Sequence, residues 1–170
     1  MKKKIIIPSA ILFVAIACFA LLPQQKSSSS DVVEDFMHKV ITTAKQGDAA
    51  AQTLLGAMYL DGRGGMAQDD EKAVKWWRKA AGQGYTLAQY YLGWMHDEGR
   101  GVIQDDVEAY FWCYLAAESE HETGHKRAAE LRDIIAKRLS QKELMDAQKR
   151  AREWQPREWQ PKTAGETIAD

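Results

Sequence analysis

An internal repeat is the feature that most constrains the fold of this chain. The segment from Ala51 to Ala81 has a near copy from Ala88 to Ala117. The first halves of the copies are offset by 37 positions and the second halves by 36, because the first copy carries one extra residue after its glycines. Repeats of this length are typical of solenoids, in which each unit buries its apolar face against the next. The residues that define the repeat are Gly56, Gly62, Gly64, Trp76, Gly93, Gly99, Gly101 and Trp112.

Each copy is predicted to form two helices. In the first copy, apolar residues fall at i, i+3, i+4, i+7 and i+8 from Ala51 and again from Ala73. Glycines at residues 62–65 and 99–101 separate the two halves, because glycine readily adopts the left-handed conformation that ends a helix. Carboxylates that can cap free N–H groups precede the second helices. They are Asp69, Asp70, Asp105 and Asp106.

Two further glycines, Gly56 and Gly93, are expected inside the first helix of each copy. Glycine in a helix interior costs about 1 kcal/mol relative to alanine. We therefore expect a neighbouring helix to approach closely at both positions.

The first copy also resembles a known family. Residues 51–84 read AQxxLGxMYxxGxG, a short loop with QDD, and KAxxWWxKAAxxG, which is similar to the Sel-one-like repeat, a relative of the tetratricopeptide repeat. The second copy departs from this pattern where His96 replaces Tyr59 and Cys113 replaces Trp77. The resemblance implies an adaptor that binds other proteins, with the first helix of each unit lining a concave face.

The predicted fold is all-α, a short α-solenoid of helix-turn-helix repeats with a leading helix and a two-helix C-terminal cap. We expect this domain to span residues 31–154. Its parts are a leading helix at 31–47, repeats at 48–84 and 85–119, and capping helices at 126–154. Asp31 with Glu34, and Ser140 with Glu143, are helix-capping signatures.

The cap is expected because the second copy is more apolar than the first. Phe111, Tyr114 and Leu115 stand where the first copy has Lys75, Arg78 and Lys79. Burying each large apolar side chain contributes roughly 1.5–3 kcal/mol, so these positions predict a covering element.

The N-terminal residues 1–23 are interpreted as a signal peptide or membrane anchor. Three lysines precede an apolar run at residues 5–22, and a polar linker follows at 24–30. The protein is therefore expected to be exported. It would be periplasmic or secreted after cleavage, or anchored to the inner membrane by residues 5–22, and a lipidated Cys18 is a third alternative. Membrane contact is expected only through this segment.

Composition argues against a nucleic-acid partner and against a disulfide-bonded fold. The formal net charge is −1, without a basic cluster of the kind that binds phosphates, so no nucleic-acid partner is expected. The chain has two cysteines, Cys18 and Cys113, which provide no disulfide framework. No cofactor is predicted.

The C-terminal residues contain a duplication, with REWQP at 152–156 and again at 157–161. Pro156 and Pro161 prevent one continuous helix through both copies. We interpret the first copy as the end of the capping helix and residues 155–170 as a disordered tail. A docking peptide that carries the tryptophan is the alternative.

One segment resembles a metal site. His121, Glu122 and His125 match the HExxH pattern of zinc hydrolases, and Glu143 is a nominal third ligand. Polar residues precede the segment and Gly124 weakens a helix, so a chance match in a loop is favoured. The alternative is an exported hydrolase, zinc-dependent or acting on cell-wall or β-lactam substrates by analogy with cysteine-rich relatives. His96 and Cys113 are expected in the core.

The candidate binding residues are Tyr90 and Trp94, together with Gln89. The first copy has only Thr53 and Ala57 at the positions of the two aromatics, so the repeat itself does not require them, and aromatic side chains often anchor interfaces. Packing against the preceding unit is the alternative. We therefore predict a non-catalytic adaptor of the bacterial-type cell envelope that binds a protein or peptide on its concave face. An assembly factor that docks through its cap helices is a further hypothesis.

Overall fold

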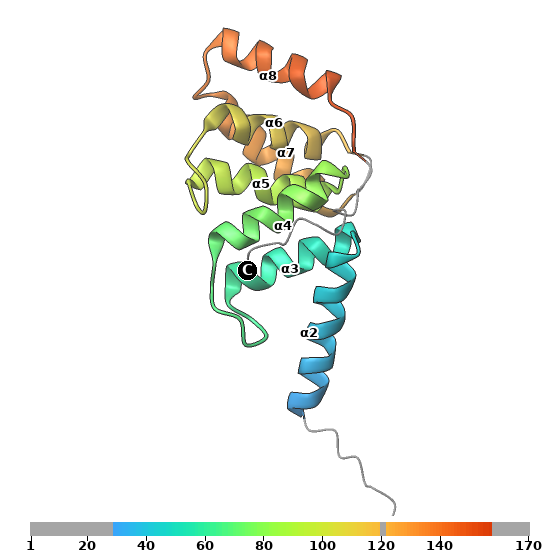
Figure 1. Ribbon diagram of the computed structural model, residues 1–170. Helices are drawn as coiled ribbons and strands as arrows, with labels where there is room; N and C mark the ends of the chain where they lie inside the picture. The colour runs from blue at the N-terminus through green and yellow to red at the C-terminus, as the bar shows by residue number, and fades with distance from the viewer. Residues whose placement is uncertain (1–28, 120–121, 158–170) are drawn as a thin grey trace, which may run out of the picture. The chain divides into compact units, whose positions relative to one another are not determined.

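The computed structural model describes residues 29–119 and 122–157, and this part of the chain contains seven α-helices and no strand. Helices α3, α4, α5, α6 and α8 follow one another in a stack, and α7 packs on α5 and α6 (Figure 1). The predicted all-α solenoid with a leading helix and a two-helix cap is confirmed. The helices are α2 (Ser29–Lys45), α3 (Ala49–Asp61), α4 (Asp70–Gly82), α5 (Thr86–Glu98), α6 (Asp106–Ala117), α7 (Glu122–Ala136) and α8 (Gln141–Glu153).

The turns within the repeats have the predicted chemistry. Gly62 and Gly99 end α3 and α5 in the left-handed conformation, each with φ of 65°. Asp69 and Asp105 then act as the N-caps of α4 and α6, where their carboxylates accept backbone N–H groups of the first turn. Local sequence therefore sets the turn between the two helices of each repeat.

The two helical glycines make room for the second helix of their own unit. A Cβ atom at Gly56 would lie 2.5 Å from Nε1 of Trp77, and one at Gly93 would collide with Sγ of Cys113. Trp77 is fully buried, stacks on Tyr91 with 4.6 Å between ring centroids, and donates from Nε1 to the Thr53 carbonyl at 3.0 Å. The predicted close approach of the helices is confirmed.

A buried glutamine ties each repeat to the preceding helix. The amide of Gln52 donates to the Ala44 carbonyl at 3.1 Å, and the amide of Gln89 donates to the Ala81 carbonyl at 3.4 Å. Both glutamines are almost completely buried, so each needs a partner for its polar atoms. The glutamine that follows alanine at the start of each repeat is therefore a structural residue.

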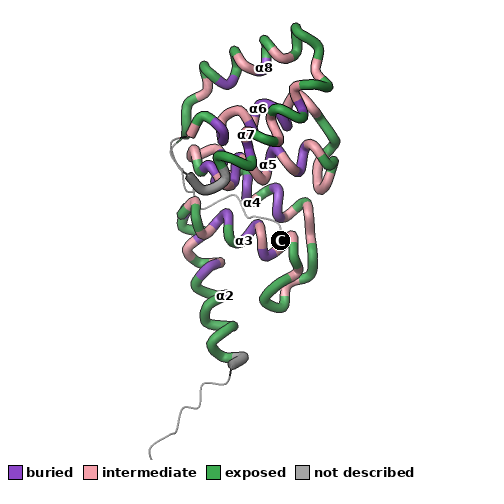
Figure 2. The backbone as a smooth tube through the Cα atoms, turned by 180° about the vertical axis from the view of Figure 1, so that it is seen from behind, coloured by how far each residue is buried: buried purple, intermediate pink, exposed green. Residues whose placement is uncertain are grey.

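The leading helix α2 uses only its C-terminal half in the core. Met37, Val40 and Ala44 pack against Leu55 and Met58, whereas the more N-terminal apolar residues are at least half exposed (Figure 2). Those exposed residues are Val32, Val33 and Phe36. Because the helix starts at Ser29, Asp31 lies in its first turn and not at the predicted cap. The chain divides into two compact units after Val32. The contacts of Met37, Val40 and Ala44 lie within the second unit, which begins at Val33.

The cap covers the second repeat as predicted, with one change of boundary. Helix α7 begins at Glu122, four residues before the predicted start of the cap at residue 126. Ile135 of α7 and Ala147 of α8 pack with Tyr110, whose hydroxyl accepts from the Gln148 amide at 3.0 Å. Ser140 and Glu143 form the predicted capping box at the start of α8.

The chain after α8 does not leave the fold at residue 155, where the tail was predicted to become disordered. A Cβ atom at Gly84 would lie 3.3 Å from Pro156, and the N–H of Arg157 donates to the Gly82 carbonyl at 2.8 Å. Residues 154–157 therefore connect α8 to the turn between α4 and α5. The second REWQP copy extends beyond residue 157 and so lies mostly outside the described residues.

No helix in the described part of the chain is long and apolar enough to span a bilayer. The predicted signal or anchor at residues 1–23 lies outside the described residues.

Candidate functional site

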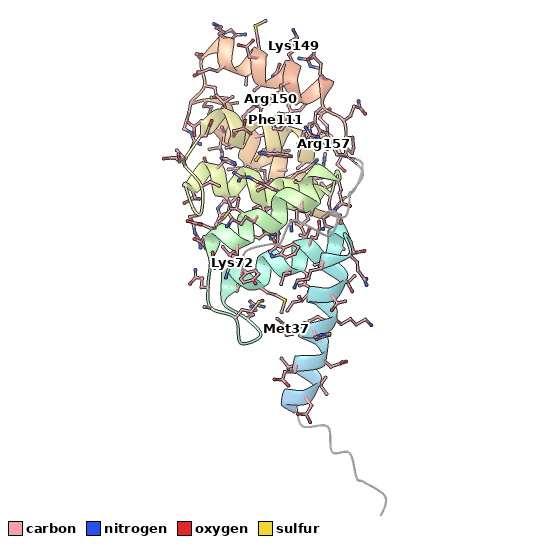
Figure 3. All side chains as sticks on the ribbon, in the orientation of Figure 1. Met37, Lys72, Phe111, Lys149, Arg150 and Arg157 are labelled. Atoms are coloured by element: carbon pink, nitrogen blue, oxygen red, sulfur yellow. The ribbon has the colours of Figure 1, made fainter. Side chains whose placement is uncertain are left out.

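A hollow of about 550 Å³ opens between the second helices of successive units, and we call it the aromatic–arginine hollow. Helices α4, α5, α6 and α8 and the segment after α8 supply its walls, and Figure 3 labels three of its residues, Phe111, Arg150 and Arg157. Its volume is typical of pockets that take small ligands or a few side chains of a partner. Its aromatic and arginine lining residues are Arg78, Phe111, Trp112, Arg150, Trp154 and Arg157.

Aromatic rings form one side of the hollow. Phe111 and Trp112 meet edge to face with 5.0 Å between their centroids, and Trp112 meets Trp154 in the same manner at 6.4 Å. These edge-to-face contacts stabilise the rings in fixed orientations. The repeat thus supplies Trp112, and the end of the capping helix supplies its partner.

Three arginines also line the hollow. Arg150 lies over the ring of Phe111, 3.8 Å from its centroid, and forms an ion pair with Glu108 at 2.8 Å. Arg78 and Arg157 have no carboxylate partner among the described residues. The hollow therefore contains three guanidinium groups and one carboxylate, and it is electropositive.

His96 of α5 also lines the hollow. Its residue is 7% exposed, and its Nδ1 has no hydrogen-bond partner in the described part of the chain. Burial lowers the pKa of His96, with Glu108 and Asp105 acting in the opposite direction and Arg78 in the same direction. The imidazole is therefore neutral at pH 7 and retains unused hydrogen-bonding capacity.

The predicted binding residues on α5 do not gather in one exposed cluster. Gln89 is buried, as described above. Tyr90 packs on Ala116, Ala117 and Ala128 of the following helices. Trp94 packs on the core between α4 and α5, and Arg100 lies over its ring at 5.2 Å. Both aromatics keep partial exposure, so their role in binding stays a prediction.

The described part of the HExxH segment, residues 122–125, is helical, contrary to the predicted loop. Glu122 and His125 belong to the first turns of α7, while His121 lies outside the described residues. Within residues 29–119 and 122–157, no group of three or more histidine, cysteine, aspartate or glutamate residues is placed to hold a metal ion. Glu143 instead accepts from the backbone and hydroxyl of Ser140 in the capping box.

Cys113, which replaces a tryptophan of the repeat pattern, is a buried thiol. Cys113 is fully buried in the α6 core beside Gly93, and burial raises the pKa of its thiol to about 12. A thiol with so high a pKa is a poor nucleophile at neutral pH. Its placement in the core agrees with the sequence prediction.

The sequence alone does not identify the hollow, although it marks some of its residues. Trp112 is a repeat position, and Phe111 is expected under the cap. The contribution of Trp154 and Arg157 depends on the path of the chain after α8, which no local pattern specifies. The only signal in the sequence is the REWQP duplication, in which both residues lie.

The geometry defines the chain as an α-helical repeat protein. Its hollow is lined mainly by side chains of the second helices of the units. The Sel1 repeat pattern matches residues 49–85 and 86–121. The chain therefore belongs to the Sel1 repeat family. Proteins of this family typically mediate protein–protein interactions, and their fold is generally non-catalytic.

Two solved structures are similar to the chain. One is a protective antigen of uropathogenic Escherichia coli strains that displays an SLR fold, with 31% sequence identity over 84% of this chain and a TM-score of 0.63. The chain spans 28% of the length of that antigen. The other is a Sel1 repeat protein from Oxalobacter formigenes, with 30% identity over 69% of this chain and 98% of its own, and a TM-score of 0.47. No curated protein matches the chain.

Proposed function

We propose that this protein is a non-catalytic adaptor of the cell envelope that binds a protein or peptide partner in the aromatic–arginine hollow. The observation that carries the proposal is the grouping of Trp112, Trp154 and Phe111 beside Arg78 and Arg157 in one preformed hollow. Tryptophan, tyrosine and arginine are the residues most enriched among binding hot spots. A preformed site also loses little conformational entropy when a partner docks.

The location of the hollow differs from the face that family resemblance favoured. The hollow lies on the second helices of the units, whereas Tyr90 and Trp94 lie on the first helix of the second unit. The proposal is therefore specific about which substitutions weaken binding, and the two faces can be tested separately.

Affinity capture from envelope extracts tests the proposed function. The full-length protein, the Trp112→Ala variant and the Tyr90→Ala variant are compared, with Ile103→Ala as the control because Ile103 is 89% exposed in a turn outside the hollow. We expect one or more proteins retained by the wild type and by Ile103→Ala to be lost with Trp112→Ala. Capture that survives Trp112→Ala and is lost with Tyr90→Ala would place the interface on the other face. No specific capture by the wild type would contradict the adaptor function.

Export remains part of the proposal and depends on residues 1–23. The lysines and the apolar run at residues 5–22 support it. The mass of the N-terminal peptide recovered from native membranes and from the soluble envelope fraction distinguishes a cleaved, a lipidated and an anchored form. An intact N-terminus on protein found only in the cytoplasm would contradict export.

A further inference from the structure

We propose that the ligand of the aromatic–arginine hollow is an acidic peptide segment in which a carboxylate side chain stands next to an aromatic or large apolar residue. This inference rests on the proposed function and adds the chemistry of the partner. Arg78 and Arg157 bind the carboxylate, and Trp112 with Trp154 contact the apolar neighbour.

The positive charge of the hollow favours a negatively charged ligand. Glu108 already pairs with Arg150 at 2.8 Å, which leaves Arg78 and Arg157 without a carboxylate among the described residues. A guanidinium group offers a planar fork of donors that matches the two oxygens of a carboxylate. A neutral segment offers only carbonyl oxygens, which accept weaker hydrogen bonds from a guanidinium group than a carboxylate does, and a positively charged segment would be repelled.

The aromatic side of the hollow distinguishes a peptide from a simple anion. Phe111 is only 4% exposed and is held beneath Arg150, whereas Trp112 and Trp154 retain partial exposure at the surface of the hollow. Burying an apolar side chain against these indole rings contributes affinity that a free carboxylate or phosphate cannot gain. The volume of about 550 Å³ is large enough for more than one side chain.

The test uses the full-length protein and four fluorescein-labelled peptides with both ends blocked. Each peptide has glutamate or glutamine at its centre, flanked by phenylalanine or by alanine. Binding is followed by fluorescence anisotropy at low and at moderate salt. We expect the glutamate–phenylalanine peptide to bind about tenfold or more tightly than each of the other three, with an affinity that falls as salt is added.

Variants then localise the binding. Arg78→Gln and Arg157→Gln are each expected to weaken binding of the glutamate–phenylalanine peptide about tenfold and to leave the glutamine peptides unaffected. Arg63→Gln is the matched control, because Arg63 is 75% exposed and pairs with Asp61 in a turn outside the hollow. Circular dichroism melting of each variant shows whether it is folded, which is expected because Arg78 and Arg157 are exposed.

Three results would overturn the proposal. They are equal affinity for the glutamate and glutamine peptides, unchanged affinity in Arg78→Gln and Arg157→Gln, and binding to anionic lipid vesicles through Arg78 with no binding to any peptide. If envelope capture depends on Trp112 while the peptides show no preference for glutamate, the adaptor function stands and the acidic chemistry is wrong. If capture fails as well, both are wrong.

Discussion

Arg138 holds the carboxylate of Asp106 with two hydrogen bonds, from Nε at 3.0 Å and from an Nη nitrogen at 2.8 Å. One unit earlier, Arg100 holds Asp70 in the same bidentate manner, with both bonds at 3.0 Å. Asp70 and Asp106 are equivalent residues at the starts of α4 and α6. Each arginine lies in or near the turn that follows the next helix along the chain.

The cap shares this ion pair with the second repeat, but it does not share the packing of a repeat. Helix α7 packs on α5 and α6, and α8 packs on α6, whereas the close packing of α3 on α4 and of α5 on α6 has no counterpart between α7 and α8. The loop between α7 and α8 carries Arg138 where the loop of the second repeat carries Arg100, although the glycines and the tryptophan of the repeat are absent from the cap sequence. The stack therefore ends on a cap that keeps the ion pair and lacks the repeat motif, and end units of solenoids are commonly atypical in this way.

The first prediction concerns this ion pair. A double-mutant cycle with Arg138→Gln and Asp106→Asn should give a coupling free energy of about 0.5–1 kcal/mol in unfolding, because partly exposed ion pairs contribute little even with good geometry. Urea unfolding measures it, and the cycle with Arg100→Gln and Asp70→Asn is the matched comparison. Similar coupling in both cycles supports a shared ion pair. No coupling between Arg138 and Asp106, with clear coupling between Arg100 and Asp70, would contradict it.

The second prediction concerns the close approach at Gly93. Replacing Gly93 by alanine should destabilise the protein by about 1–3 kcal/mol, because the new Cβ would overlap Sγ of Cys113. Thermal and urea unfolding measure the change. Replacing Cys113 by alanine in the same protein should recover part of the loss, since it removes the overlapping sulfur.

Gly82 provides the control for that substitution. It ends α4 without a left-handed φ, and a methyl group added to its Cα would meet nothing within 4 Å apart from its chain neighbours and the nearby backbone of α4. Gly82→Ala should therefore leave stability unchanged or raise it by about 0.5–1 kcal/mol. Equal effects of alanine at Gly82 and at Gly93 would show that helix packing does not require the glycine.

The third prediction concerns the response of stability to pH. Burial holds the pKa of His96 below its ordinary value of 6.5, so the unfolded chain binds a proton more readily than the folded one. The free energy of unfolding should therefore fall as pH decreases below about 6.5 toward the folded pKa. Urea unfolding between about pH 7.5 and pH 5 should show a smaller loss for His96→Gln than for the wild type. A steeper loss in the variant would contradict the assignment.

The fourth prediction concerns Cys113. Its thiol is buried and its pKa is raised to about 12, so iodoacetamide at about pH 8 should leave it unmodified in the folded protein. The same reagent should label it completely in denaturant. Peptide mass mapping separates Cys113 from Cys18. Rapid labelling of Cys113 in the folded protein would mean that α6 opens readily from the stack.

The repeat geometry is predictable from sequence because local signals determine it. The glycines that end helices, the aspartates that cap them and the apolar period all act within a few residues. The offset between copies then specifies which helices pair. The structural roles of Gln52 and Gln89 are not predictable in this way, since a hydrogen bond to a carbonyl eight residues earlier follows from packing and not from a local motif.

The candidate site is much less predictable. Tyr90 and Trp94 stand out as surplus aromatics, but pattern alone does not reveal that each packs against a different neighbouring helix. Trp154 and Arg157 enter the hollow because Pro156 packs near Gly84, a contact between residues 72 positions apart. Tertiary contacts at that separation leave no periodic signal in a single sequence.

Photo-crosslinking in the envelope is the most direct test of the central claim that the protein binds its partner in the aromatic–arginine hollow. Benzoylphenylalanine is placed at position 112, 94 or 103 of the full-length protein, and cells are irradiated before the adducts are identified by mass spectrometry. We expect a discrete protein adduct from position 112 and none from position 103. An adduct from position 94 alone, or no adduct from any position, would contradict it.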